Sequence, residues 1–171
     1  MFNKAIEDRR SIRKFKETPV PQEKIEALLY AAMLAPSACN SRPWRFIVIT
    51  RREILSKLAD NHNHAKMLHT APVAIVICAL AQEQAKNPIA EGFYPQDCAA
   101  ATQNILLAAQ EMGLATCWCG VYPKEALIPT VREILELPED EIPFNIIALG
   151  EGDEMPKARG FYDAQKVRWV R

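Results

Sequence analysis

The stretch from residue 95 to residue 113 constrains the fold more than any other part of the chain. It has the features of one helix: Pro95 fits a first turn, Asp97 adds a negative charge there, and Gly113 fits a left-handed cap at the end. Between residues 97 and 112 the only charges are Asp97 and Glu111. A helix that is apolar on nearly all sides is normally buried. We therefore expect a central helix beside a subunit interface, with an ordinary core helix of a monomer as the alternative.

Hydrophobic periodicity predicts further elements around this helix. The expected helices span residues 1–10, 22–34, 51–60 and 123–137, with a short one near Met67 and Leu68. The expected strands span residues 45–50, 72–79, 114–119 and 143–149. The strand at 72–79 has no polar alternation, which indicates burial on both faces. Residues 81–94 are expected to form a polar loop. Residues 151–171 form a polar tail, in which 167–170 can add a strand to an exposed sheet edge.

Composition bounds the class of protein. The chain has 171 residues, which suits a single domain, and its 21 Lys and Arg balance 21 Asp and Glu. This balance argues against a general binder of nucleic acid or of membrane surfaces. The chain has five cysteines, an odd number, and none of them forms a C-x-x-C pair. No signal peptide is evident, and no apolar run is long enough to span a bilayer. We therefore expect a cytoplasmic protein with no membrane and no nucleic-acid partner.

Two basic clusters stand at opposite ends of the chain. The first contains Arg9, Arg10, Arg13, Lys14 and Lys16, and the second contains Lys157, Arg159, Lys166, Arg168 and Arg171. The loop at 36–44 is also rich in hydrogen-bond donors. Like charges this dense repel unless an anion offsets them, and the fork of arginine matches a phosphate. The clusters therefore favour a small anionic ligand, with solvated turns and a plain connecting loop as the alternatives.

Four blocks of sequence carry a family resemblance. They are RRSIRKF near the start, PSACNSRPWRF, QDCAAATQNILLAAQEMGLATCWCGVYP, and IALGEGDEMPKAR near the end. Their order and combination resemble the FMN-dependent nitroreductase family across essentially the whole chain. The sequence has no nucleophile elbow, no Walker motif and no G-x-G-x-x-G fingerprint, which suits an enzyme whose chemistry belongs to a cofactor.

The resemblance implies an α+β fold. Its central, mostly antiparallel sheet is flanked by helices, and two subunits form a homodimer. One domain would span residues 1–171, and its tail at 151–171 would be exchanged between the subunits. Each of two FMN molecules would bind in a cleft to which both subunits contribute.

The resemblance also implies cofactor contacts. Arg9, Arg10 and Ser11 resemble ligands of the phosphate and ribityl chain. Arg13 resembles the cation at the pyrimidine edge of the flavin, and Lys66 a second cation near the ring. Pro36, Ser37 and Asn40 resemble the loop that the other subunit contributes. Trp118, Cys119 and Gly120 resemble the segment whose backbone approaches flavin N5. Lys157 and Arg159 resemble the pair of tail residues that returns to the phosphate.

The function implied is that of an NAD(P)H-dependent flavin oxidoreductase with a ping-pong mechanism. NADH or NADPH is the expected co-substrate. A nitro compound, a quinone or a similar small molecule is the expected electron acceptor, and no side chain of the chain is assigned a catalytic role because the chemistry takes place at flavin N5. One alternative is a flavin carrier or sensor with little turnover.

A second alternative is a thiol or metal protein built on Cys117, Cys119 and the three histidines. The histidines have no ligand partners at zinc-like spacing and are expected in a solvated loop. The two cysteines are expected to point to opposite faces of their strand, which argues against this alternative.

Overall fold

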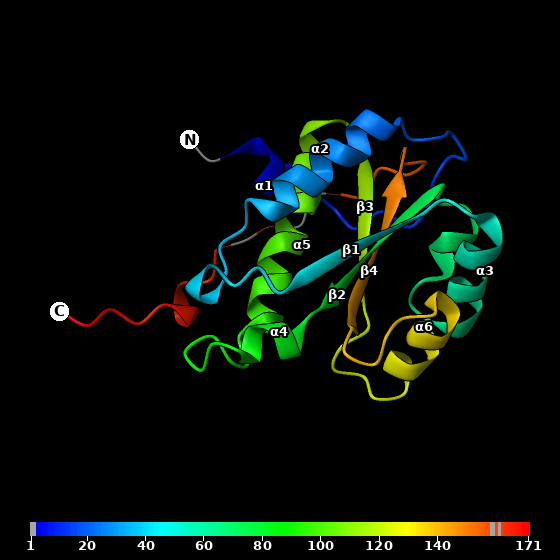
Figure 1. The fold of residues 1–171 in the computed structure, drawn as a ribbon. Helices are drawn as coiled ribbons and strands as arrows, with labels where there is room; N and C mark the ends of the chain where they lie inside the picture. Colours follow the sequence, from blue (N-terminus) through cyan, green and yellow to red (C-terminus); the bar gives the residue numbers. More distant parts are fainter. Residues whose placement is uncertain (1–2, 158–159, 161) are drawn as a thin grey trace.

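A four-stranded antiparallel sheet forms the centre of the protein (Figure 1). The computed structural model describes residues 3–157, 160 and 162–171. The strands are β1 (Trp44–Ile49), β2 (Val73–Ala79), β3 (Ala115–Gly120) and β4 (Ile142–Gly150), and they lie in the order β1-β2-β4-β3. The four strands expected from the sequence are confirmed, as is the α+β class.

Helices cover both faces of the sheet. α2 (Gln22–Met33) and α5 (Tyr94–Glu111) lie on one face, and α3 (Arg52–Asn61) and α6 (Leu127–Leu135) lie on the other (Figure 1). Strand β2 is buried along its whole length because its alternate side chains enter the two hydrophobic cores. Ala74, Val76 and Cys78 face α3, whereas Val73 and Ile75 face α5. The continuous apolar run at 72–79 therefore reflects a strand between two layers.

Helix α5 is buried on one side only within a single chain. Cys98, Ala101, Ile105 and Ala109 pack against α2 and the sheet, whereas the opposite face is half-buried or exposed. The helix ends as expected, since Gly113 adopts a φ of +70° just after it. A nearly all-apolar helix is thus only half covered within a single chain.

Three predicted boundaries are corrected by the structure. The segment expected as a loop at 81–94 contains a short helix, α4 (Ala81–Ala85), which is held against the protein by its buried residue Gln84. The helix expected at 123–137 begins only at Leu127, so that Pro129 falls in its first turn, where proline is tolerated. The N-terminal helix is limited to α1 (Lys4–Asp8), and residues 1–2 lie outside the described residues.

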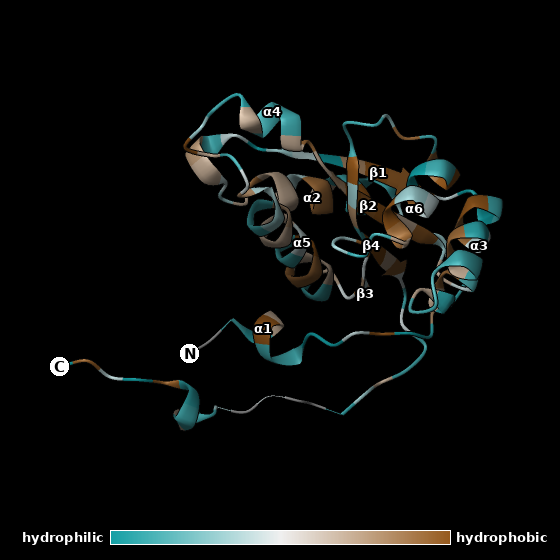
Figure 2. Ribbon diagram, turned by 90° about the horizontal axis from the view of Figure 1, so that it is seen from below, coloured by the Kyte–Doolittle hydropathy of each residue, from teal (hydrophilic) through white to brown (hydrophobic). Residues whose placement is uncertain are grey.

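The two chain ends run alongside each other outside the helical layers (Figure 2). The described residues also form three short 3₁₀ helices, η1 (Ala38–Asn40), η2 (Lys66–His69) and η3 (Ala164–Lys166). In the described part of the tail, residues 167–170 form no strand, and Trp169 and Val170 are 73% and 86% exposed. None of the helices described is both long and apolar enough to cross a bilayer.

Candidate functional site

A cavity of about 700 Å³ opens at the outer edge of β3. Its walls are the N-terminal basic segment, the segment around η2, and β3 itself. The lining residues are Arg13, Lys14, Phe15, Asn63, His64, Lys66, Met67, Thr70, Cys117, Trp118 and Asp153. This volume falls in the range typical of small-molecule sites. The cavity brings together Arg13, Lys66 and Trp118, which the sequence placed in one site.

The N-terminal segment is held against β3 and the start of the tail. The N–H of Ile12 donates to the C=O of Thr116 at 2.9 Å, and the N–H of Asp153 donates to the C=O of Lys14 at 2.9 Å. The carboxylate of Glu154 accepts the N–H groups of Arg13 and Lys14. Ile12 is also buried in the core, whereas the side chains of Arg13 and Lys14 are exposed.

Arg10 joins the two basic clusters. Its Nη1 donates to the C=O of Glu7 and of Arg9, each at 2.6 Å, and its Nε donates to the C=O of Lys157 at 3.3 Å. The N-terminal basic segment therefore meets the main chain of the tail at Lys157, whereas the convergence of cations from both chain ends on a phosphate stays a prediction. Arg159, the other member of the predicted tail pair, lies outside the described residues.

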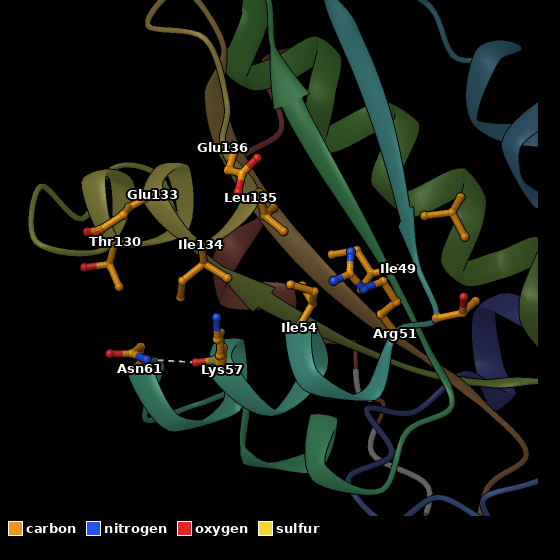
Figure 3. Close-up of a pocket in the computed structure, with 12 residues that line it drawn as sticks. Ile49, Arg51, Ile54, Lys57, Asn61, Thr130, Glu133, Ile134, Leu135 and Glu136 are labelled. Carbon is orange, nitrogen blue, oxygen red and sulfur yellow. Dashed lines mark hydrogen bonds between the residues drawn. The ribbon is translucent and has the colours of Figure 1, made fainter.

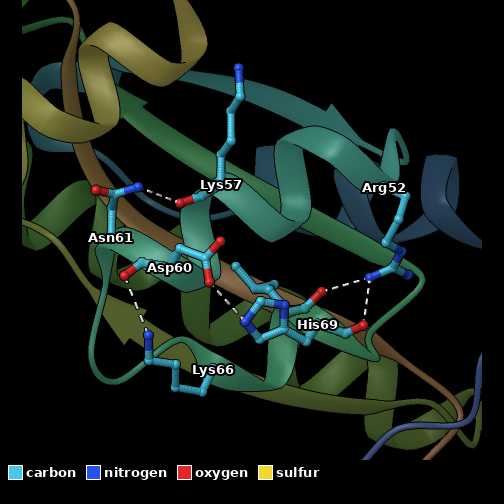
Figure 4. A network of polar contacts seen from close by, with 7 residues as sticks. Arg52, Lys57, Asp60, Asn61, Lys66 and His69 are labelled. Atoms are coloured by element: carbon cyan, nitrogen blue, oxygen red, sulfur yellow. Dashed lines mark hydrogen bonds and ion pairs between the residues drawn. The ribbon is translucent and has the colours of Figure 1, made fainter.

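The opposite wall of the cavity is fixed by Arg52 (Figure 4). The guanidinium donates to the C=O groups of Leu68, His69 and Ala71 at 2.7, 3.0 and 2.9 Å, which satisfies the carbonyl end of η2. Lys66 begins η2, and its Nζ donates to the C=O of Asp60 at 3.3 Å. Since Met67 and Leu68 are buried, as expected, Lys66 stays at the rim of the cavity.

The backbone of β3 faces the cavity. In an antiparallel edge strand the N–H and C=O of every second residue point to the same side. The C=O of Thr116 and the C=O of Gly120 both point away from β4, the first toward Ile12 and the second toward the imidazole of His62. The main chain of Trp118, midway between them, therefore points the same way. A Cβ placed on Gly120 would meet no atom within 4 Å, so a ligand can approach this backbone closely.

The two cysteines of β3 share one face of the strand. Cys117 and Cys119 are both buried in the same core, which makes the expectation that they diverge wrong, because residues two apart in a strand point the same way. A hydrogen bond from Cys119, with help from Arg13, lowers the pKa of Cys117 to about 7 against the effect of burial. The pKa of Cys119 is correspondingly raised. The described residues contain no cluster of His, Cys, Asp and Glu that could hold a metal ion.

The predicted loop from the other subunit does not reach this cavity within one chain. Pro36, Ser37 and Asn40 lie at the start of β1, where the Ser37 hydroxyl accepts the N–H of Arg42 at 2.9 Å. Three residues of this loop have positive φ without being glycine: Cys39, Asn40 and Arg42. Such conformations cost roughly 1 kcal/mol or more each and gather at functional sites.

A buried polar cluster holds that loop in place. The carboxylate of Asp97 accepts the N–H of Ala38 at 3.1 Å and the side-chain amide of Gln84 at 2.7 Å, and that amide also donates to Ser41 at 3.0 Å. Asp97 and Gln84 are both buried. The start of α5 therefore anchors the loop through Asp97, a role that sequence reasoning did not assign.

Sequence reasoning also missed His62 and Asn63. His62 was expected in a solvated loop but is only 2% exposed, and Asn63 lines the cavity beside it. Periodicity gave no signal here, because these residues lie between α3 and η2, where neither a helical nor a strand pattern applies.

A second cavity, of about 640 Å³, lies between α3, α6 and the outer edge of β1 (Figure 3). Arg51, Lys57, Glu133 and Glu136 line it together with apolar residues such as Ile54. Its charges are mixed, and its lining includes none of the predicted cofactor contacts that the structure describes. It is thus a poor match for an anionic cofactor.

A model of the nitroreductase family matches residues 6–63 and 60–151, nearly the whole chain outside the tail. The chain belongs to the nitroreductase family. A protein of Methanothermobacter thermautotrophicus, provisionally named an NADH dehydrogenase/NAD(P)H nitroreductase, is 45% identical over 95% of this chain and 83% of its own length.

Solved structures agree with this assignment. An FMN-dependent nitroreductase of Clostridium difficile R20291 is 34% identical, with a TM-score of 0.87 over 98% of both chains. A protein of Desulfovibrio desulfuricans, provisionally named a nitroreductase and solved in complex with FMN, is 28% identical, with a TM-score of 0.83 over 98% of this chain and 95% of its own. The nitroreductase fold expected from the sequence is therefore confirmed.

Proposed function

We propose that this chain is an FMN-dependent NAD(P)H oxidoreductase whose cofactor binds in the cavity at the edge of β3. The observation that carries the proposal is the cavity lined by Arg13 and Lys66, together with the hydrogen bond that joins the N-terminal basic segment to the tail at Arg10 and Lys157. The relatives named as nitroreductases, and the FMN complex of the Desulfovibrio protein, support the same assignment.

The residues present fit FMN. The phosphate needs several cationic and hydrogen-bonding groups, and Arg9, Arg10 and Ser11 would supply them with Lys157 and Arg159 from the tail. The ring needs a flat, partly apolar slot with polar groups at its edge. The backbone of Trp118 and Gly120 points away from β4 and offers that edge, while Cys119 lies between them, and the open space at Gly120 allows close approach.

When bound, FMN would accept electrons from NADH or NADPH and pass them in a second half-reaction to a nitro compound, a quinone or a similar planar acceptor. Arg13 and Lys66 would favour the reduced state, because their positive charges face the part of the site where negative charge develops. No acid or base from the chain is needed, since solvent can supply protons at a cavity open to water. The open mouth of the cavity would also allow electron acceptors of several shapes to enter.

A second copy of the chain would complete the site. Its Pro36, Ser37 and Asn40 would approach the cavity, which they do not reach within one chain. The apolar side chains of Tyr30 and Met33 in α2, and of Leu34 just after it, are exposed and offer a surface for association. We propose a homodimer on these grounds.

The tail would exchange between the copies at β1. The outer edge of β1 is flanked on the α3 side by the cavity of Figure 3 and on the α2 side by a cavity of about 390 Å³ lined by Val20, Ile25 and Leu29. A strand added at this edge points alternate side chains to opposite faces. Residues 167–170 of a partner would therefore fill both cavities.

The proposal is tested by the absorbance spectrum of the purified protein. We expect a yellow protein whose flavin band bleaches when NADH or NADPH is added without oxygen and returns when a quinone or nitro compound is added. A band that neither nucleotide changes would contradict the reductase. Bound FMN that bleaches slowly, with negligible steady-state turnover, would favour the carrier or sensor instead.

A further inference from the structure

His62 is buried beneath the wall of the cofactor cavity and makes two directed hydrogen bonds. Its Nδ1 accepts the backbone N–H of His64 at 3.1 Å, and its Nε2 lies 2.9 Å from the C=O of Gly120. An N–H can only donate and a carbonyl can only accept, so Nδ1 must be unprotonated and Nε2 must carry the proton. The network therefore fixes a neutral imidazole in a single tautomer.

These two bonds connect opposite walls of the cavity. Gly120 ends β3, whose residues Cys117 and Trp118 line one wall. His64 belongs to the other wall, together with Asn63 and Lys66. The sulfur of Cys119 adds a parallel link, at 3.3 Å from the C=O of His64. The imidazole of His62 is thus a rigid spacer between the wall that presents backbone groups and the wall that presents Lys66.

We propose that His62 is a positioning residue for FMN, which sets the spacing and orientation of the Gly120 backbone relative to the Asn63–Lys66 wall. This inference rests on the proposed function. A planar ring binds well only where the two edges of its slot are held at a fixed separation, and preorganisation of this kind lowers the cost of binding. A buried histidine with both nitrogens engaged can hold that separation because its ring has no internal torsion.

Two substitutions divide the roles of the two ring nitrogens. In His62→Gln the side-chain amide nitrogen reaches about as far as Nε2 and can still donate to Gly120. In His62→Asn the amide oxygen stands near the position of Nδ1 and can still accept from His64, but nothing reaches Gly120. His69→Gln is the matched control, because the exposed His69 side chain pairs with the Asp60 carboxylate and neither residue lines the cavity (Figure 4).

The experiment titrates each full-length variant with FMN and follows the quenching of flavin fluorescence and the position of the visible band. We expect His62→Asn to bind FMN roughly tenfold more weakly, because it loses the buried hydrogen bond to Gly120 that ties the two walls together. We expect His62→Gln, which keeps that bond and loses only the one from His64, to stay within about threefold of the parent. The bound band should shift in His62→Asn, whereas His69→Gln should match the parent in both measurements.

A second measurement uses the unsubstituted protein and remains decisive if a variant fails to fold. The ¹⁵N spectrum of the imidazole should show the proton on Nε2 at neutral pH, and saturation with FMN should slow exchange of that proton with solvent. Unchanged exchange, or equal FMN binding by all four proteins, overturns the role of His62 while leaving the proposed function intact. A parent protein that binds no FMN overturns both.

Discussion

The Nε of Arg10 donates to the main-chain oxygen of Lys157 at 3.3 Å, which joins residues near the two ends of the chain. The same guanidinium also holds the C=O groups of Glu7 and Arg9. The side chain is therefore fixed by main-chain oxygens, and its position depends on the tail as much as on the N-terminal segment. The N-terminal basic segment and the tail therefore meet at this hydrogen bond.

Replacement of Arg10 by lysine should weaken FMN binding about tenfold or more. Lysine keeps the charge but lacks the planar fork, and so cannot hold three main-chain oxygens and still face a phosphate. Isothermal titration with FMN measures the effect. Lys4→Ala, which removes an exposed cation from the same segment, is the control, and weaker binding by Lys4→Ala with unchanged binding by Arg10→Lys would show that only the total charge matters.

Substitutions at Asp97 should separate loss of stability from loss of loop geometry. In Asp97→Ala the N–H of Ala38 and the amide of Gln84 lose their acceptor in a buried place, which costs about 1–3 kcal/mol for each group. Asp97→Asn should cost less, because the side-chain oxygen of Gln84 has no partner in the structure and can accept from the new amide after a flip. Urea unfolding measures the free energy of unfolding of both variants. An Asp97→Asn variant as unstable as Asp97→Ala would contradict the flip of the Gln84 amide.

The thiol of Cys117 should react with small thiol reagents through an inflection near pH 7. Its pKa is lowered from 9.0 to about 7, chiefly by the hydrogen bond from Cys119, so the reactive thiolate forms about two units earlier as pH rises. Methyl methanethiosulfonate with mass mapping, in a Cys39→Ser background, follows this site. Cys119→Ala should move the inflection upward, and bound FMN should protect the thiol, since Cys117 lines the cavity.

Truncation after Gly160 should weaken association of the chains. It removes Trp169 and Val170, which are exposed in a single chain, but keeps Lys157 in contact with Arg10. Sedimentation equilibrium should show a dimer for the full chain and a larger monomer fraction for the truncated one. A truncated chain that associates as tightly as the full one would place the interface on α2 and α5 alone.

Several features were readable from local sequence. The pattern at 72–79 predicted a strand buried on both faces, and the charge-poor stretch at 95–113 predicted the long helix with its glycine cap. These predictions succeeded because apolar periodicity and capping act over a few residues. The blocks that resemble nitroreductases added the sheet architecture, and the family comparisons confirm it.

The site residues were harder to place from the sequence. Arg13, Lys66 and Trp118 were expected together, and the cavity contains all three. His62, Asn63 and the anchoring role of Asp97 were missed, since each acts through a contact with a distant segment: His62 with Gly120, and Asp97 with Ala38. The prediction that Cys117 and Cys119 point to opposite faces is wrong, because residues two apart in a strand point to the same face.

The sequence by itself determined which segments become helices and strands, and that cations gather near both chain ends. Only the tertiary structure decided that the tail meets Arg10, that Gly120 is tied to His62, and that the loop around Ser37 lies away from the cavity of its own chain. The reason is physical. Secondary structure depends on neighbours a few residues apart, whereas a binding site depends on hydrogen bonds and packing between segments that approach one another only after the sheet has formed.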